Sequence, residues 1–277
     1  MLKLNASRKF VSGLALAAAL MVSGAALAPA SAETATSAVW QGLHKDIFGG
    51  REVLDAQDMI SMDAPIRAED AAVVPITIKM PASFAANVKT LTLVVDQNPS
   101  PVVAAIKYGA AAGTGDRMLS TRIRMDQYSD VRAIAETNDG KLYMISKFVK
   151  ASGGCSAPAA KDAEEAAKSI GKMQIKKFVS KEGDTLTAEA QIMIKHPNTT
   201  GMQMDQLTGL YTPARYVNKI EVKSGADVIF SMEGGISISE DPNFRFTHGG
   251  KSGDAIEVKA QDSDGASFAG QLAPSQS

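Results

Sequence analysis

The sequence predicts an all-β protein built from two β-sandwiches in tandem. Apolar and polar residues alternate in many short runs, which is the pattern of half-buried strands. Gly, Asn and Asp interrupt these runs at short intervals, as turns between strands require. One Ala-rich stretch of helical character divides the runs into two groups. Many short strands in two separate groups indicate two sandwich domains.

The first 32 residues predict a secretory signal peptide. A basic start precedes an apolar run over residues 13–27, and Ala30-Ser31-Ala32 then gives the small-x-small cleavage pattern. The apolar run is too short for a stable membrane span. We therefore expect cleavage after Ala32, export to the periplasm and a soluble mature chain that begins at Glu33.

The charge distribution and the cysteine content limit the kinds of function that the protein can have. The 29 Lys and Arg residues nearly balance the 30 Asp and Glu residues, and the two signs are mixed along the chain. This distribution makes nucleic acid an improbable partner. Cys155 is the only cysteine, so no internal disulfide can form. An unpaired cysteine in an exported protein indicates either intermolecular pairing or a reactive thiol.

The first sandwich is expected to follow a short amphipathic helix. Trp40, Leu43 and Ile47 have helical spacing, Gly49-Gly50 ends the helix, and Trp40 is expected to pack against the core. Alternation then predicts strands, including a stretch in which Arg122 and Arg124 lie on the polar face. These strands and the closing hairpin cover residues 74–80, 91–95, 121–125, 131–136 and 141–149.

Two further segments complete the chain. Residues 159–170 are Ala-rich, with Glu164 and Lys168 at i,i+4 spacing and Gly171 as a stop, and they predict a short linker helix. A second β-rich region begins near Met173, and its clearest alternating runs are residues 186–194, 228–232, 236–238, 244–246 and 256–258.

The most distinctive stretch is residues 150–158, KASGGCSAP, which we call the arm. Ser152, Gly153, Gly154 and Ser156 surround Cys155 with small residues that have almost no apolar area. Glycine permits conformations that other residues resist. We therefore predict a flexible arm that presents an accessible thiol to a partner. The alternative is an incidental cysteine that dimerises or stays idle.

No other residues form a recognisable catalytic or metal site. His44, His196 and His248 lie far apart in the sequence and have no second cysteine nearby, so the common zinc spacings are absent. His196 precedes a proline and is interpreted as a turn or interface residue. No Ser-His-Asp arrangement, P-loop or Rossmann pattern stands out. We expect no catalytic residues, no metal and no cofactor, and hence no enzyme.

Several motifs resemble a known pair of proteins. The first half is similar to SoxY, the carrier protein of bacterial sulfur oxidation, and the second half resembles its partner subunit SoxZ. The SoxY-like motifs are Ala64-Pro65, Ala68–Pro75, Asn98–Pro101, Thr121–Arg124 and Gly153-Gly154-Cys155. The SoxZ-like motifs are His196-Pro197, Thr200-Gly201, Ser239–Pro242, Phe244, Phe246 and Gly253-Asp254.

The resemblance implies a fused SoxYZ-like carrier, of a type associated with quinoprotein alcohol dehydrogenase systems. It implies two immunoglobulin-like sandwiches, over residues 33–155 and 173–277, joined by a linker helix within residues 156–172. By resemblance, Cys155 is the covalent attachment site. Unlike the terminal GGCGG arm of SoxY, this arm is internal, and Ser156 and Ala157 replace the trailing glycines.

Two functions follow from the resemblance. In the first, the protein is a periplasmic, non-enzymatic carrier that holds a covalent, sulfur-linked intermediate on Cys155. The two domains pair within one chain, and the second helps present the intermediate to partner oxidising enzymes of the Sox type or of a quinoprotein dehydrogenase system. In the alternative, the protein is an adaptor of the dehydrogenase system, and Cys155 is dispensable.

Overall fold

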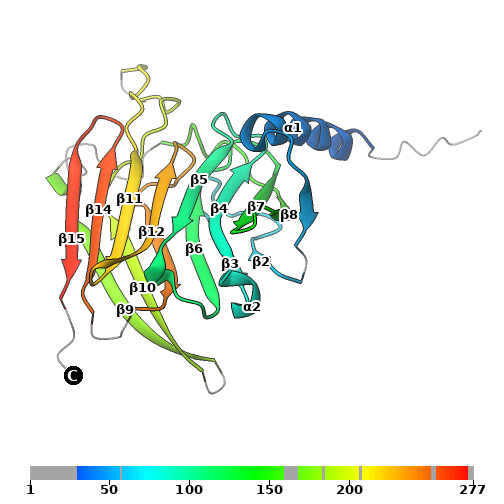
Figure 1. Ribbon diagram of the computed structural model, residues 1–277. Helices are drawn as coiled ribbons and strands as arrows, with labels where there is room; N and C mark the ends of the chain where they lie inside the picture. Colours follow the sequence, from blue (N-terminus) through cyan, green and yellow to red (C-terminus); the bar gives the residue numbers. More distant parts are fainter. Residues whose placement is uncertain are drawn as a thin grey trace, which may run out of the picture.

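Two β-sheets pack face to face in the computed structural model (Figure 1). The structure describes residues 30–56, 58–158, 168–182, 185–205, 208–250 and 254–273. The prediction of an all-β fold is confirmed for these residues. Most of the predicted signal peptide and linker helix lies outside them, so those two predictions are not tested here.

The larger sheet has nine strands and contains residues from both predicted domains. In spatial order it consists of β1 (Val53–Asp55), β8 (Leu142–Val149), β7 (Ser129–Thr137), β4 (Val88–Val95), β5 (Val102–Tyr108), β12 (Asp227–Gly234), β11 (Val217–Ser224), β14 (Ile256–Asp262) and β15 (Ser267–Leu272). All neighbouring strands are antiparallel except β1 and β8, which are parallel.

The smaller sheet has six strands and is also shared between the domains. Its order is β2 (Ser61–Asp63), β3 (Val74–Met80), β6 (Arg117–Ile123), β13 (Asn243–His248), β10 (Thr185–Ile194) and β9 (Met173–Glu182). The helical elements of the described residues include α1 (Ala30–Phe48), α2 (Ala82–Ala85) and the 3-10 helix η1 (Ala110–Ala112).

The two halves of the chain join in both layers. In the larger sheet β5 pairs with β12, with Ile106 opposite Met232. In the smaller sheet β6 pairs with β13, with Leu119 opposite Phe246. Each half therefore forms a two-sheet sandwich, and the sheets of the first half continue into those of the second. The sequence predicted the two groups of strands but not this continuity.

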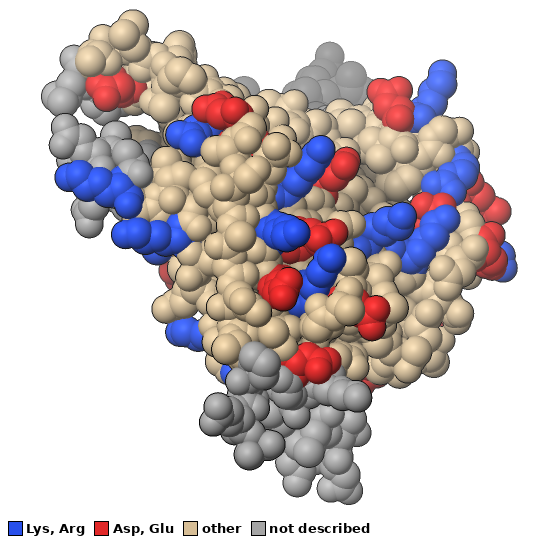
Figure 2. All heavy atoms as spheres, turned by 60° about the vertical axis from the view of Figure 1, so that its left-hand side comes forward, with Lys and Arg blue, Asp and Glu red and all other residues tan. Residues whose placement is uncertain are grey.

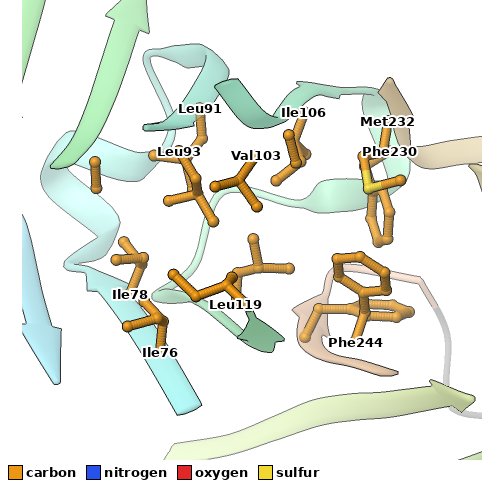
Figure 3. Close-up of a cluster of buried hydrophobic side chains, with 14 of the residues drawn as sticks. Ile76, Ile78, Leu91, Leu93, Val103, Ile106, Leu119, Phe230, Met232 and Phe244 are labelled. Atoms are coloured by element: carbon orange, nitrogen blue, oxygen red, sulfur yellow. The ribbon is translucent and has the colours of Figure 1, made fainter. Parts of the chain in front are cut away.

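A single hydrophobic core lies between the layers and crosses the boundary between the halves. Figure 3 shows side chains of the larger sheet facing those of the smaller sheet. Phe230 of β12 meets Phe246 of β13 edge to face, with ring centroids 5.0 Å apart. The fully buried Phe244 belongs to the same cluster. Because both halves contribute to one core, we expect them to stabilise each other.

Helix α1 covers the outer face of the larger sheet. Trp40 and Leu43 pack against a separate buried cluster that includes Val94 and Ile134. The guanidinium of Arg132 lies over the Trp40 ring, 4.5 Å from its centroid. The helix ends at Phe48, before two glycines with positive φ. The prediction of an amphipathic helix with Trp40 as a packing residue is confirmed.

The predicted hairpin of the first half is present and leads into the arm. Strands β7 and β8 pair in register from Ser129 and Val149 to Glu136 and Leu142, and Gly140 in the turn has a φ of 82°.

The distribution of charged side chains on the surface agrees with the mixed charges of the sequence. On the face drawn in Figure 2, Lys and Arg side chains lie among Asp and Glu side chains.

Candidate functional site: the Cys155 arm

The arm is bound to the protein through its backbone. The N–H of Gly153 donates to the carbonyl oxygen of Asp126, and the N–H of Gly154 donates to that of Met125, both at 2.8 Å. Gly153 adopts a φ of 82°, which lies in the left-handed region that favours glycine. These bonds fasten the arm to the segment that follows β6.

Gly154 permits this close approach because it has no side chain. A Cβ at this position would collide with the carbonyl oxygen of Ala71, and would lie 2.8 Å from that of Met125. The backbone of the arm therefore occupies a space that admits no larger residue at position 154. The sequence indicated that Gly154 makes the arm flexible. In the structure, its missing side chain lets the backbone of the arm pack closely against the carbonyl groups of Ala71 and Met125.

The second half of the chain holds the other side of the arm. The hydroxyl of Thr200 donates to the carbonyl oxygen of Cys155 at 2.6 Å. The amide of Gln203 donates to the carbonyl oxygen of Ala157 at 3.1 Å. The Gln203 side chain also accepts the N–H of Thr200 at 3.0 Å, so these two residues brace each other. The arm thus lies at the junction of the two halves.

Arg124 lies beneath the arm and also bridges the two halves. Its side chain donates to the carbonyl oxygen of Gly154 at 3.0 Å and to that of Asn198 at 3.5 Å. The residue is only 1% exposed. We expected Arg124 on the polar face of a strand, and this prediction is wrong. The strand ends at Ile123, and the chain beyond it turns inward under the arm.

Asn98 organises the segment that supports the arm. Its amide donates to the carbonyl oxygen of Arg124 at 2.7 Å and to the hydroxyl of Ser237 at 2.9 Å. Its oxygen accepts the N–H of Asp126 at 2.9 Å. In the sequence, Asn98 was identified only as part of a motif that resembles SoxY. Because it contacts both halves, it fixes the position of the two carbonyl groups that receive the arm.

The Cys155 thiol is free and completely buried. Burial raises its pKa to about 12, the nearby Asp126 carboxylate adds to the increase, and Arg124 opposes it. At neutral pH the thiol is therefore protonated, whereas the thiolate is the reactive form. The expectation of an accessible thiol is wrong for this conformation. Small side chains gave no apolar anchor, but backbone hydrogen bonds from both halves hold the arm instead.

The remaining candidate residues do not join this site. His196 is buried, its Nδ1 accepts the N–H of Asn198 at 3.0 Å, and its Nε2 lies 3.4 Å from Asp262. His248 is buried elsewhere, in β13. Among the described residues no group of three His, Cys, Asp or Glu side chains is arranged to hold a metal ion. In the same part of the chain, no helix has the length and apolarity needed to cross a membrane.

A hollow of about 520 Å³ lies on the outer face of the smaller sheet, away from the arm. Its lining includes Arg117, Glu189 and Arg245. Glu189 and Arg245 form an ion pair of 2.6 Å with each other. The arm contributes no residue to the lining of this hollow. We therefore take the arm and its contacts as the candidate site.

Comparisons with known proteins match the two halves of the chain to two different families. The family model described as sulfur oxidation protein SoxY matches residues 44–155, and the model described as sulphur oxidation protein SoxZ matches residues 175–273. No curated protein matches the chain.

Two solved structures show limited similarity. The sulfur carrier protein SoxY from Chlorobium limicola f thiosulfatophilum is 22% identical, with a TM-score of 0.35, and the match covers 43% of this chain and 96% of that one. A beta-glycosidase from Bacteroides vulgatus is 8% identical, with a TM-score of 0.23, and the match covers 78% of this chain and 24% of that one.

The two family matches follow one another and cover most of the chain. The first match ends on Cys155, and the second begins in β9. The mostly β structure in two sheets agrees with the immunoglobulin-like sandwiches of both families. The chain is therefore a fused SoxYZ-like protein, in which a SoxY domain precedes a SoxZ domain.

Proposed function

We propose that this protein is a non-enzymatic carrier that holds a covalent, sulfur-linked group on Cys155 and presents it to partner oxidising enzymes. One observation carries the proposal. The SoxY match ends at residue 155, on the only cysteine of the chain, and that cysteine is free. A carrier of this kind needs one nucleophilic sulfur and no catalytic machinery of its own.

The docked arm is the resting state of this carrier. The thiol is buried and protonated in this state, so loading and transfer take place after the arm is released. The arm is held by the backbone hydrogen bonds of Gly153 and Gly154 and by individual hydrogen bonds from Thr200, Gln203 and Arg124. Such bonds each contribute about 0.5–1.5 kcal/mol net, so a docking partner is able to replace them. The tethered arm then presents Cys155 at the junction of the two halves.

The location and partners are part of the same proposal. The first 32 residues favour export to the periplasm with removal of the leader after Ala32. The proposed partners are periplasmic oxidising enzymes, either of the Sox type or of a quinoprotein dehydrogenase system. Because the arm contacts both halves, a partner that approaches Cys155 meets SoxY-like and SoxZ-like surfaces together.

Burial of the thiol also favours a second candidate function. A fully buried cysteine with a raised pKa behaves as a small apolar residue. In this alternative the protein is an adaptor of the dehydrogenase system, and the arm only helps to join the two halves. Cys155 would then be replaceable by any residue that fits the same space.

Replacement of Cys155 separates the two functions. Cys155→Ala removes the nucleophile and keeps the site apolar, and Ser156→Ala is the matched control because Ser156 is exposed. The carrier predicts that Cys155→Ala fails to restore growth of a deletion strain while Ser156→Ala restores it. It also predicts a mass adduct on the native periplasmic protein that a thiol reductant removes. Full complementation by a folded Cys155→Ala variant would establish the adaptor instead.

A further inference from the structure

Within the described part of the chain, Arg124 is a buried cation without an ion pair. No carboxylate of the described residues lies within 4.0 Å of its guanidinium nitrogens, and its Nε has no hydrogen-bond partner. Asp70 and Glu240 act on it only through longer-range electrostatics. Burial lowers its pKa from the ordinary value. Buried charges in proteins are normally paired, because desolvation of an unpaired charge is expensive. The arrangement therefore leaves a place for an anion.

The missing negative charge is expected on the side of Cys155. Arg124 donates to the carbonyl oxygen of the preceding residue, Gly154, at 3.0 Å. Among the ionisable groups that interact with Arg124, Cys155 has the strongest effect. The thiol itself does not supply a charge in the docked arm, since it stays protonated at neutral pH. A group attached to its sulfur is able to do so.

We infer that Arg124 is the binding residue for negative charge on the Cys155 side chain, and that the docked arm favours a carried group that is anionic over a neutral group of the same size. This inference rests on the proposed function, since it concerns the group that Cys155 carries. Arg124 acts as the counter-cation, and its unpaired Nε is the available donor.

One charge nearby works against this preference. The Asp126 carboxylate raises the pKa of Cys155 by more than Arg124 lowers it, so it repels an anion at the sulfur itself. Asp126 is partly exposed, whereas Arg124 is 1% exposed. Water screens the partly exposed charge more strongly than the buried one. For a carried group seated against the guanidinium we therefore expect the attraction by Arg124 to prevail, and removal of the Asp126 charge should increase the preference.

The test uses two alkylating probes that differ in charge alone. The chain is unfolded in urea and modified at its only cysteine with iodoacetate or with iodoacetamide. In each reaction a sulfur–carbon bond forms, iodide leaves and the thiol proton passes to the buffer. The products, carboxymethyl and carbamidomethyl cysteine, have the same number of heavy atoms, but the first is an anion. After refolding, the ratio of folded to unfolded protein is measured by urea titration for each adduct.

In the wild type we expect this ratio to be about tenfold higher for the anionic adduct, since a hydrogen bond between two charged groups is stronger than one to a neutral group. Arg124→Gln should abolish the difference, and Arg124→Lys should retain part of it. Asp126→Asn should increase it. Arg122→Gln is the matched control, because Arg122 donates to the carbonyl oxygen of Asp241 instead. Its difference should equal that of the wild type.

Two results would overturn the inference. One is a wild-type anionic adduct that is no more stable than the neutral one, and the other is a preference that survives Arg124→Gln. If Arg124→Gln does not refold, the wild-type comparison and Arg124→Lys decide. The proposed function is tested separately, by complementation with Cys155→Ala. A strain that needs Cys155, together with adducts of equal stability, would remove the role of Arg124 and leave the carrier intact.

Discussion

The hydroxyl of Thr200 donates a 2.6 Å hydrogen bond to the carbonyl oxygen of Cys155, across 45 positions of sequence. Thr200 belongs to the SoxZ match and Cys155 ends the SoxY match. The second domain therefore helps to hold the arm that the first domain supplies. Since this bond is made to the backbone, it does not depend on the chemistry of the sulfur.

Loss of the Thr200 hydroxyl should expose the thiol more often. Thr200→Val keeps the size of the side chain but leaves the Cys155 carbonyl oxygen without this donor, which costs about 1–3 kcal/mol. We expect the rate of Cys155 modification by a disulfide reagent to rise about tenfold or more. Thr199→Val is the control, because the Thr199 hydroxyl donates to Pro213 and not to the arm. Equal thiol rates in the two variants would show that Thr200 does not hold the arm.

The burial of Cys155 determines how well the folded protein tolerates serine at this position. An accessible thiol would tolerate serine, but a buried serine hydroxyl without a partner costs about 1–3 kcal/mol. We therefore expect Cys155→Ser to lower the free energy of unfolding by this amount, and Cys155→Ala to lower it less. Ser156→Ala, at an exposed position, should stay within about 0.5 kcal/mol of the wild type. Urea titration checks the order, and an unchanged Cys155→Ser variant would contradict the buried environment.

The shared core predicts that the two halves unfold together. Phe244→Ala removes a fully buried ring in β13 and should cost about 3–5 kcal/mol. The only tryptophan, Trp40, lies in the other half and reports on it by fluorescence. The midpoint seen by Trp40 should shift as far as the midpoint seen by far-ultraviolet circular dichroism. A Trp40 transition that does not move would show that the halves are independent.

Two buried histidines predict a pH dependence of stability. Burial lowers the pKa of His196 and of His248 below the ordinary 6.5, so the unfolded chain binds protons more readily than the folded one. Stability should be nearly constant above about pH 6.5 and should fall progressively below it, because the unfolded chain gains protons that the folded chain does not. His196→Gln should reduce the slope between pH 7 and 5.

The Asp262 carboxyl is expected to affect stability in a different, more acidic pH range of the same experiment. Burial raises the pKa of Asp262, but hydrogen bonds from Arg215, Ala266 and His196 together lower it by more. The pKa of this carboxyl therefore lies below its ordinary value of 3.8. Its contribution to stability is therefore kept above pH 4 and lost only as the pH falls further. A decline confined to values below pH 4 would contradict the role of the histidines.

The pattern of side chains predicted the strands but not their arrangement between domains. Alternation along residues 74–80 reports that one face is buried, and β3 confirms it. Alternation does not tell which strand lies next to it. The pairing of β6 with β13 depends on contacts more than 100 residues apart, such as Ser120 with Arg245. A pattern with a period of two residues contains no information about such partners.

The site was predicted in part for a similar reason. The glycines and the cysteine identified the arm, because their composition is unusual within the chain. Its docking depends on backbone carbonyl groups and on Thr200, Gln203 and Arg124. Thr200 and Arg124 belong to the motifs that resemble SoxZ and SoxY, but nothing in the local sequence indicates that these side chains contact the arm. Arg124 was placed on a polar face because the alternation was extended one residue beyond the end of β6. The chain direction changes there, and periodicity no longer applies.

The continuous sheets have a consequence for attempts to produce either domain alone. Separation of the halves would turn β5 and β6 of the first, and β12 and β13 of the second, into unpaired edge strands. Each would present a row of free N–H and C=O groups, flanked by apolar residues of the opened core, to any other extended chain. The isolated domains should consequently recruit each other or aggregate. Fusion keeps these four edges covered at any dilution.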